Sequence, residues 1–259
     1  MSQDDWNFFF RHEDGGTRSI RLNLALRRHA PLPEMNVCVH AVVHLRDARA
    51  DGFSGREEHT MLVAIENDLS DVACLDGQAA AVACISGLGV RELIFYAKET
   101  WNIDAAIASV RQKFPQYRID VSAQHDPEWR YYQDHLCPDV AEAQQMANRG
   151  VYASLKEQGD PVTTPREIDH WACFPSGTAR DAFVEKVLGL GYTLRGEPYQ
   201  VEPDSGTTAM TYMVKFCRAD TPCPGAFDDV TAELAELAIA AGGEYDGWET
   251  LVLAGDAQV

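Results

Sequence analysis

The feature of this sequence that most restricts its fold is an order of elements that occurs twice along the chain. Apolar runs typical of strands alternate with segments whose apolar residues recur at helical spacing. In the first half the order is strand, helix, strand, strand, helix, strand. The six predicted elements cover 36–45, 59–75, 78–86, 91–98, 102–114 and 117–123. This is the order of the split βαβ unit, so we expect the first half to form a ferredoxin-like α+β sandwich.

The same order returns in the second half, after a predicted helix over 140–160 that Gly159 ends. The six elements cover 166–174, 176–191, 192–201, 209–217, 226–243 and 245–253. The two halves share no visible sequence identity, so the repeat is one of architecture. We therefore predict two tandem ferredoxin-like (βαββαβ) domains, residues 1–137 and residues 138–259.

The first domain is predicted to carry an additional hairpin at its beginning. The segment WNFFFRH is followed by the turn EDGG, and apolar residues then alternate at Ile20, Leu22, Leu24 and Leu26. Alternation after a glycine-rich turn indicates a half-buried hairpin. Its second strand is therefore expected over 19–26.

The charge of the chain limits its partners. The 259 residues include 40 acidic and 22 basic side chains, a net charge of −18, and residues 138–259 alone hold 20 acidic and 8 basic ones. Such a surface repels nucleic acid and anionic lipid and favours basic proteins, although acidic charge also serves solubility alone. We expect no direct binding of nucleic acid.

Other bulk features predict a cytoplasmic protein without membrane association. No run of 18 or more apolar residues is present, and the first residues are acidic where a secretory signal would be basic and then apolar. The seven cysteines are odd in number and mostly lie in apolar runs. This pattern favours buried free thiols over a disulfide framework.

Motifs for catalysis or cofactor binding are missing from the sequence. There is no Gly-x-Ser-x-Gly, no phosphate-binding loop ending in Lys-Ser/Thr and no His-Glu-x-x-His. The short SGLG at 86–89 joins two predicted strands, unlike a dinucleotide-binding loop. Ser176, just before a predicted helix, is expected to be an N-cap rather than part of an anion site. We predict that the protein is not an enzyme and needs no cofactor.

The best metal-ligating candidates lie in the first domain. On the predicted strand NVCVHAVVHL, the side chains of Cys38, His40 and His44 point to one side. His40 and His44 would lie about 13 Å apart along a strand, which is too far to share one ion unaided. These residues support a second hypothesis, in which the first domain binds a metal or a small molecule.

The candidate site lies where the first and last strands of the second domain meet. In this topology the two strands are adjacent and antiparallel, which brings 166–174 and 245–253 together. Aromatic rings, carboxylates and one imidazole would gather there, at Asp169, His170, Trp171, Tyr245, Asp246, Trp248 and Glu249. They would form either an aromatic edge of the core with solvated acids or a docking surface for a basic partner. The alternation in the two strands does not decide which tryptophan points inward.

The second half also resembles the RraB family, the B-type protein regulators of ribonuclease E. The matching residues, within 138–253, are Gly159-Asp160, Asp169-His170 with Phe174, Gly191-Tyr192 and Tyr245-Asp246-Gly247-Trp248. The first half, from WNFFFRHEDGG to DPEWRYYQDHL, is similar to an uncharacterised bacterial domain of unknown function that occurs ahead of RraB-like domains.

The resemblance implies a non-catalytic α+β regulator that binds ribonuclease E and lowers its RNA-cleaving activity. The surface that it binds would be basic, in agreement with the acidic charge of the second half. Such regulators carry strongly acidic terminal extensions, whereas this chain closes with AGDAQV at 254–259. We therefore predict a cytoplasmic regulator or adaptor that docks on a basic protein surface, with ribonuclease E as the implied partner.

Overall fold

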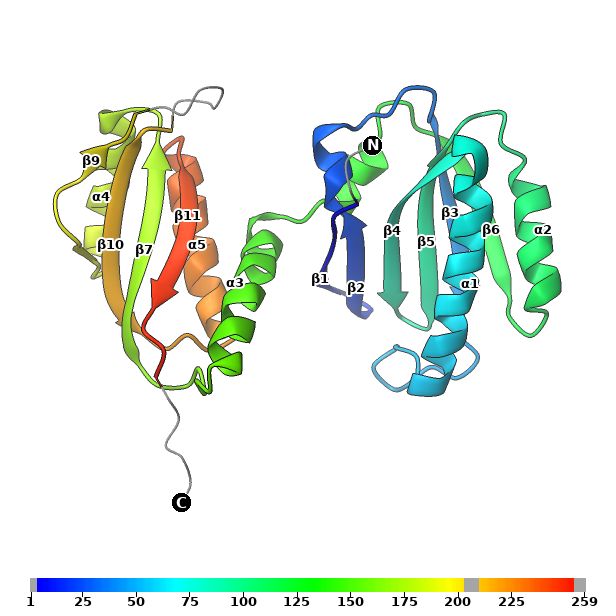
Figure 1. Ribbon diagram of the computed structural model, residues 1–259, viewed down its shortest axis with the longest axis horizontal. Coiled ribbons are helices and arrows are strands. Elements are labelled where there is room, and N and C mark those ends of the chain that lie inside the picture. The colour runs from blue at the N-terminus through cyan, green and yellow to red at the C-terminus, as the bar shows by residue number, and fades with distance from the viewer. Residues whose placement is uncertain (1–3, 203–209, 254–259) are drawn as a thin grey trace, which may run out of the picture. The chain divides into compact units, whose positions relative to one another are not determined.

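The computed structural model describes residues 4–202 and 210–253, and it divides into two compact units, Met1–Cys137 and Pro138–Val259. Each unit is a mixed α+β structure built on one sheet (Figure 1). None of the helices in the described ranges has the length and apolar character needed to span a bilayer.

The first unit contains a six-stranded antiparallel sheet in the order β1-β2-β4-β5-β3-β6. Four of its strands and two helices follow the predicted order of elements. They are β3 (Val37–His44), α1 (Arg56–Cys74), β4 (Ala79–Gly87), β5 (Val90–Ala97), α2 (Ile103–Lys113) and β6 (Ile119–His125). A 3₁₀ turn, η2 (Leu75–Gly77), joins α1 to β4.

The predicted hairpin lies at the edge of this sheet. β1 (Trp6–Glu13) and β2 (Gly16–Asn23) pair antiparallel along their whole length. The prediction that the second strand reaches residue 26 is wrong, because Leu24–Arg28 forms the 3₁₀ helix η1. Asn23 ends the strand, since its side-chain oxygen accepts a hydrogen bond from Ala25 N (3.2 Å) and caps this helix.

Both faces of the first sheet are covered. Helices α1 and α2 pack on one face, over a core that includes Ile65, Phe95 and Ile107. The segment after β6, with the π-helical turn η3 (Tyr131–Leu136), covers the opposite face. There the ring of Trp129 stacks on Tyr96, with centroids 3.9 Å apart, and both side chains are buried. The sheet is therefore the middle layer of the first unit.

The second unit contains an antiparallel sheet in the order β11-β7-β10-β8, with β9 also paired to β10. Helices α4 and α5 cover one face of it and lie behind the strands in Figure 1, with α3 packed beside α5. Its elements are α3 (Val140–Glu157), β7 (Arg166–Phe174), α4 (Gly177–Gly189), β8 (Thr193–Leu194), β9 (Tyr199–Gln200), β10 (Tyr212–Asp220), α5 (Ala226–Ala240) and β11 (Glu244–Thr250). Within 138–202 and 210–253, no helix lies on the other face of this sheet.

The strand predicted over 192–201 is interrupted. Only β8 and β9 form, because Gly196 adopts a φ of +82° and Pro198 has no N–H to donate to the sheet. The next predicted strand begins at 209, a position outside the described residues, and β10 itself starts at Tyr212.

Local signals fix the helix ends around β7. Asp139 and Glu142 form a capping box at the start of α3. Gly159 follows the end of α3 with a φ of +83°, a conformation that favours glycine. Ser176 caps α4, since its hydroxyl oxygen accepts a hydrogen bond from Ala179 N (3.2 Å). The predicted N-cap is therefore confirmed, and β7 runs between two defined turns.

Candidate functional site

Strands β7 and β11 lie side by side, as the sequence predicts. They pair antiparallel, with Trp248 opposite His170 and Glu249 opposite Asp169. The pairing brings together the two segments that carry the candidate docking residues. It also fixes which side chains share a face, because residues opposite each other in a ladder point to the same side.

The Asp246-Gly247 pair is a β-bulge rather than a turn. The register shifts between Tyr245 and Gly247, and Gly247 has a φ of +115°. A bulge inserts one residue into a strand and changes the alternation beyond it. Tyr245 and Trp248, three residues apart, therefore both point toward the helices, which explains why their spacing looked irregular in the sequence.

Three of the seven candidate residues point toward the helices, so the seven do not form one surface patch, and the interpretation as an aromatic edge of the core holds for these three. His170 is fully buried and Trp248 is only 8% exposed. The Tyr245 hydroxyl and His170 Nδ1 share a hydrogen bond of 2.7 Å. Trp248 Nε1 donates to Asn148 Oδ1 on α3 (2.7 Å). His170 and Trp248 thus pack in the interior and offer no surface to a partner, whereas Tyr245 is half-buried against the core.

Burial controls the ionisation of this interior group. Desolvation, assisted by the nearby Arg218 charge, lowers the pKa of His170 to about 3. Burial also raises the pKa of Tyr245. His170 is therefore neutral at physiological pH. Its Nε2 atom has no hydrogen-bond partner among the residues that the structure describes.

A buried polar network extends from Trp248 through the helical layer. Asn148 Nδ2 donates to Asp228 Oδ1 (2.8 Å) and to Thr231 Oγ1 (2.7 Å). The Tyr152 hydroxyl donates to the same Asp228 oxygen (2.9 Å). None of the residues predicted as a site, apart from Trp248, belongs to this network. Its available signal was an asparagine four residues before Tyr152, on the buried stripe of the helix.

A buried ion pair holds the end of β11 in place. Arg166 Nη2 donates to Asp160 Oδ1 (2.9 Å), and the same carboxylate accepts hydrogen bonds from Val162 N (2.8 Å) and Leu253 N (2.7 Å). The Arg166 hydrogen bond, with these main-chain donors, lowers the pKa of Asp160 despite its burial. Asp160 thus fastens the chain after β11 to the turn before β7.

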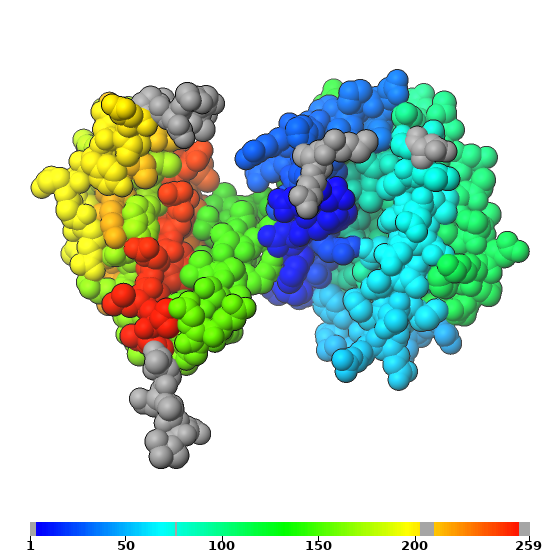
Figure 2. All heavy atoms as spheres, in the orientation of Figure 1, coloured from blue at the N-terminus to red at the C-terminus, as the bar shows by residue number. Residues whose placement is uncertain are grey.

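The other candidates lie on or beside the face of the second sheet opposite α4 and α5, which we call the open face. Asp169, Trp171 and Glu249 point to it, and Figure 2 shows this face toward the viewer, between β11 in red and the β8–β9 segment in yellow. Asp246 is exposed at the bulge. The structure therefore separates the seven predicted residues into a buried group and an exposed group.

The charges of the open face are paired around Trp171. Lys215 Nζ lies 4.4 Å from the centre of the Trp171 ring, 2.9 Å from Asp169 Oδ2 and 3.6 Å from Glu249 Oε1. Arg195 bonds Asp169 (2.9 Å) and Glu167 (2.8 Å). Burial opposes the ionisation of Asp169, but hydrogen bonds from Lys215 and Arg195 outweigh it and lower its pKa.

Toward the end of β7 and the start of β10, the open face is apolar. Met213 lies opposite Cys173 on β7 and opposite Tyr199 on β9, so the three side chains share this face. Tyr199 is 45% exposed and Val201 is 40% exposed. Aromatic residues and methionine, which this face presents at Trp171, Tyr199 and Met213, are enriched at protein–protein interfaces.

The weak metal candidates of the first unit do not converge on one point. His40 Nδ1 bonds Glu92 Oε1 (2.7 Å), whereas His44 Nε2 bonds Asp120 Oδ2 (2.8 Å). Cys38 is buried, and its thiol lies 3.5 Å from His40 Nε2. Within residues 4–202 and 210–253, no group of three or more His, Cys, Asp or Glu side chains is placed to hold a metal ion.

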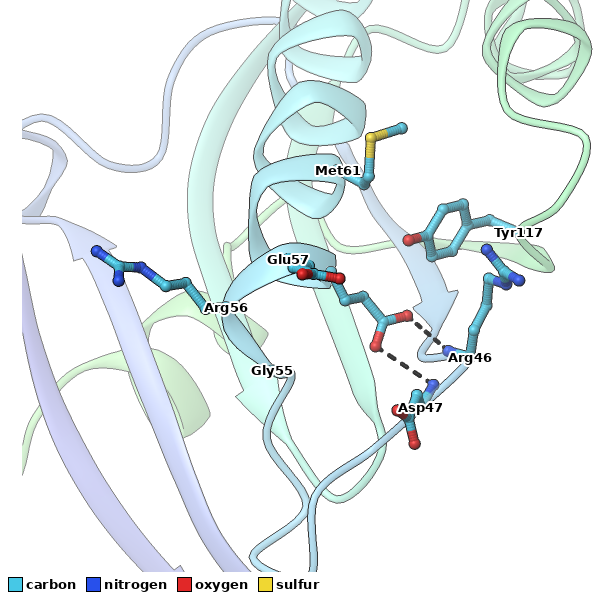
Figure 3. Close-up of a pocket in the computed structure, with 8 residues that line it drawn as sticks. Arg46, Asp47, Gly55, Arg56, Glu57, Met61 and Tyr117 are labelled. Carbon is cyan, nitrogen blue, oxygen red and sulfur yellow. Dashed lines mark hydrogen bonds between the residues drawn. The ribbon is translucent and has the colours of Figure 1, made fainter.

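A polar hollow of the first unit lies at the start of α1 (Figure 3). Glu58 there accepts hydrogen bonds from the main-chain N–H groups of Arg46 (2.7 Å) and Asp47 (3.3 Å). Asp47, Glu57 and Glu58 line it together with Arg46 and Arg56. Because carboxylates outnumber guanidinium groups, this hollow has no excess positive charge for an anion such as phosphate.

Comparisons with known proteins identify a different family in each unit. Residues 4–137 match the family described as "Family of unknown function (DUF695)", and residues 145–250 match "Regulator of ribonuclease activity B" (RraB). No curated protein matches the chain. A crystal structure of an unknown protein from Galdieria sulphuraria aligns at 14% identity over 84% of this chain and 99% of that chain, with a TM-score of 0.23. The chain therefore belongs to the DUF695 family, whose model covers residues 4–137, and residues 145–250 are similar to the RraB family.

Proposed function

We propose that this protein is a non-catalytic, cytoplasmic regulator that binds a ribonuclease, with ribonuclease E as the partner implied by the RraB family. Docking occurs through the open face of the second sheet, and the partner contributes a basic segment. We also propose that both units have a ferredoxin-like fold. The strand orders β4-β5-β3-β6 and β11-β7-β10-β8, together with the βαββαβ order of elements, support this assignment.

The arrangement of Lys215 carries this proposal. Its ammonium group is held by an aromatic ring and two carboxylates, those of Trp171, Asp169 and Glu249. This combination is a binding site for a cation. A lysine or arginine of a partner would displace Lys215 and bind the same three groups.

The remaining contacts would come from both ends of the open face. Tyr199, Val201 and Met213 offer apolar area next to Trp171. The excess of acidic over basic residues in 138–259 would speed the approach of a basic segment. His170, Tyr245 and Trp248, which point toward the helices, would contribute only by shaping the sheet.

The proposal is tested with purified full-length protein and purified ribonuclease E. A complex is expected, together with a dose-dependent decrease in cleavage of a single-stranded RNA substrate. Both effects should weaken as salt rises, because exposed charge pairs are screened. Absence of a complex at low salt, with both proteins folded, would refute ribonuclease E as the partner.

A further inference from the structure

The first unit contains a cavity of about 650 Å³ at the edge of strand β4. Strand β2 pairs with β4 only from Ala83 to Ser86, and the chain then leaves the sheet at Asn23 to form η1. The first residues of β4, Ala79–Ala81, consequently have no strand beside them on the β2 side within the described part of the chain. The cavity occupies this place.

The walls of the cavity are predominantly apolar. They come from η1, the loop that follows it, the end of α1 and the start of β4, and include Leu26, Leu32, Pro33, Met35, Ala80 and Ala81. Polar groups gather at one end, where Asn23 Nδ2 donates to Asp4 Oδ1 (3.0 Å) and Asn23 Oδ1 accepts from Ala25 N (3.2 Å). The polar end is thus internally bonded, and the walls favour an apolar occupant.

The loop over the cavity is tied to the rest of the unit. Trp129 Nε1 donates to the carbonyl of Met35 (2.8 Å), and Lys98 Nζ lies 3.5 Å from Glu34. Lys98 N also donates to the carbonyl of Gln78, just before β4 (2.9 Å). Because both walls are held by such bonds, the cavity is preformed rather than opened by a ligand.

We propose that the first unit binds a small, predominantly apolar, uncharged molecule in this cavity, with one amide, carbonyl or hydroxyl group bonded to the main chain at the open edge of β4. The volume lies within the range of about 300–1,000 Å³ that is usual for small-molecule sites. An anion would be repelled by Asp4, and the described residues of the lining include no group of three ligating side chains placed to hold a metal ion. The site lies in a different unit from the open face and does not depend on ribonuclease binding.

The neutral fluorophore N-phenyl-1-naphthylamine is the probe for a test on the full-length protein. Its fluorescence should rise in a saturable way, with one molecule bound per chain. Leu32→Trp, which fills the cavity from the loop, should weaken binding at least tenfold. Ala80→Leu fills it from the opposite wall and should act in the same direction.

Leu188→Trp is the matched control, because Leu188 is exposed on α4 in the second unit, and it should bind the probe like the wild type. A thermal melt confirms that each variant is folded. The proposal is overturned if the probe does not bind saturably, or if Leu32→Trp and Ala80→Leu, both folded, bind it as tightly as the control.

Discussion

Gly247 lies directly opposite Trp171 in the ladder between β11 and β7. Because glycine has no side chain, it leaves the Trp171 ring uncovered on that flank of the open face, while Lys215 covers the other. The bulge that places Gly247 there also turns Tyr245 and Trp248 into the interior. A single backbone irregularity thus separates the core aromatics from the surface aromatic.

Replacing Gly247 with alanine should lower the free energy of unfolding by about 1–3 kcal/mol, because a φ of +115° strains any residue with a Cβ atom. Urea denaturation measures the change. Gly150→Ala is the control, since Gly150 lies in helix α3 without an unusual φ and with open space around it. That variant should be neutral or slightly more stable. Equal effects of the two substitutions would contradict the role of the bulge.

His170 should make stability depend on pH. Its folded pKa of about 3 lies below its ordinary value of 6.5, so the unfolded chain binds a proton between these values and the folded chain does not. The free energy of unfolding therefore falls as pH drops below 6.5, by about 1.4 kcal/mol per pH unit from this residue. Urea denaturation at pH 7.5 and pH 5.5 should show this decrease in the wild type and a smaller one in His170→Gln.

The control for this experiment is His125→Gln, because the His125 side chain is 62% exposed. Its pH dependence should follow that of the wild type. If His170→Gln loses as much stability between the two pH values as the wild type, His170 is not the buried neutral group described above.

Asp160→Asn should cost about 3–5 kcal/mol of folding stability, because it leaves the guanidinium of Arg166 buried without its counter-ion. The double variant Asp160→Asn/Arg166→Met should recover part of the loss. Asp181→Asn, which changes a carboxylate that is 67% exposed, is the control and should change stability little. A loss for Asp160→Asn no larger than for Asp181→Asn would show that the ion pair does not hold the end of β11.

Two charge changes on the open face should alter partner binding in opposite directions. Lys215→Met frees Asp169 and Glu249 for a partner cation and should tighten binding about threefold to tenfold, whereas Glu249→Lys should weaken it similarly. Titration of ribonuclease E at low salt measures both. Lys186→Met and Glu185→Lys, exposed on α4, are the matched controls. Weaker binding by Lys215→Met would show that this lysine contacts the partner rather than taking the place of its cation.

The sequence predicted elements well where the spacing of apolar residues and a capping residue indicated the same boundary. Examples are α2, which begins after its N-cap Asn102, and β7, which ends before Ser176, the N-cap of α4. It also predicted that β7 and β11 are neighbours. It could not divide the residues of β11 between faces, because the bulge at Gly247 depends on the register with β7. The end of β2 and the interruption after Leu194 were not predicted, because the apolar pattern continues through both positions. Asn23 ends β2 by capping η1, and Gly196 interrupts the next strand with a positive φ.

The sequence holds a signal for a buried Asn148 but none for its partners, and it holds none for the cavity beside β4. The network and the cavity each depend on side chains from distant segments that meet only in the fold, such as Asn148 and Trp248, or Leu32 and Ala80. Composition identifies an acidic second half, but only the ladder shows that Asp169, Trp171 and Glu249 share one face.

The affinity of Trp171→Ala for ribonuclease E tests the central claim most directly, with Trp6→Ala in the first unit as the matched aromatic truncation. The truncation at Trp171 should weaken binding at least tenfold, about 1.4 kcal/mol or more, while circular dichroism and the melting temperature stay close to the wild type. Trp6→Ala should bind normally. Unchanged affinity of folded Trp171→Ala, under conditions in which the wild type binds, would contradict docking through the open face.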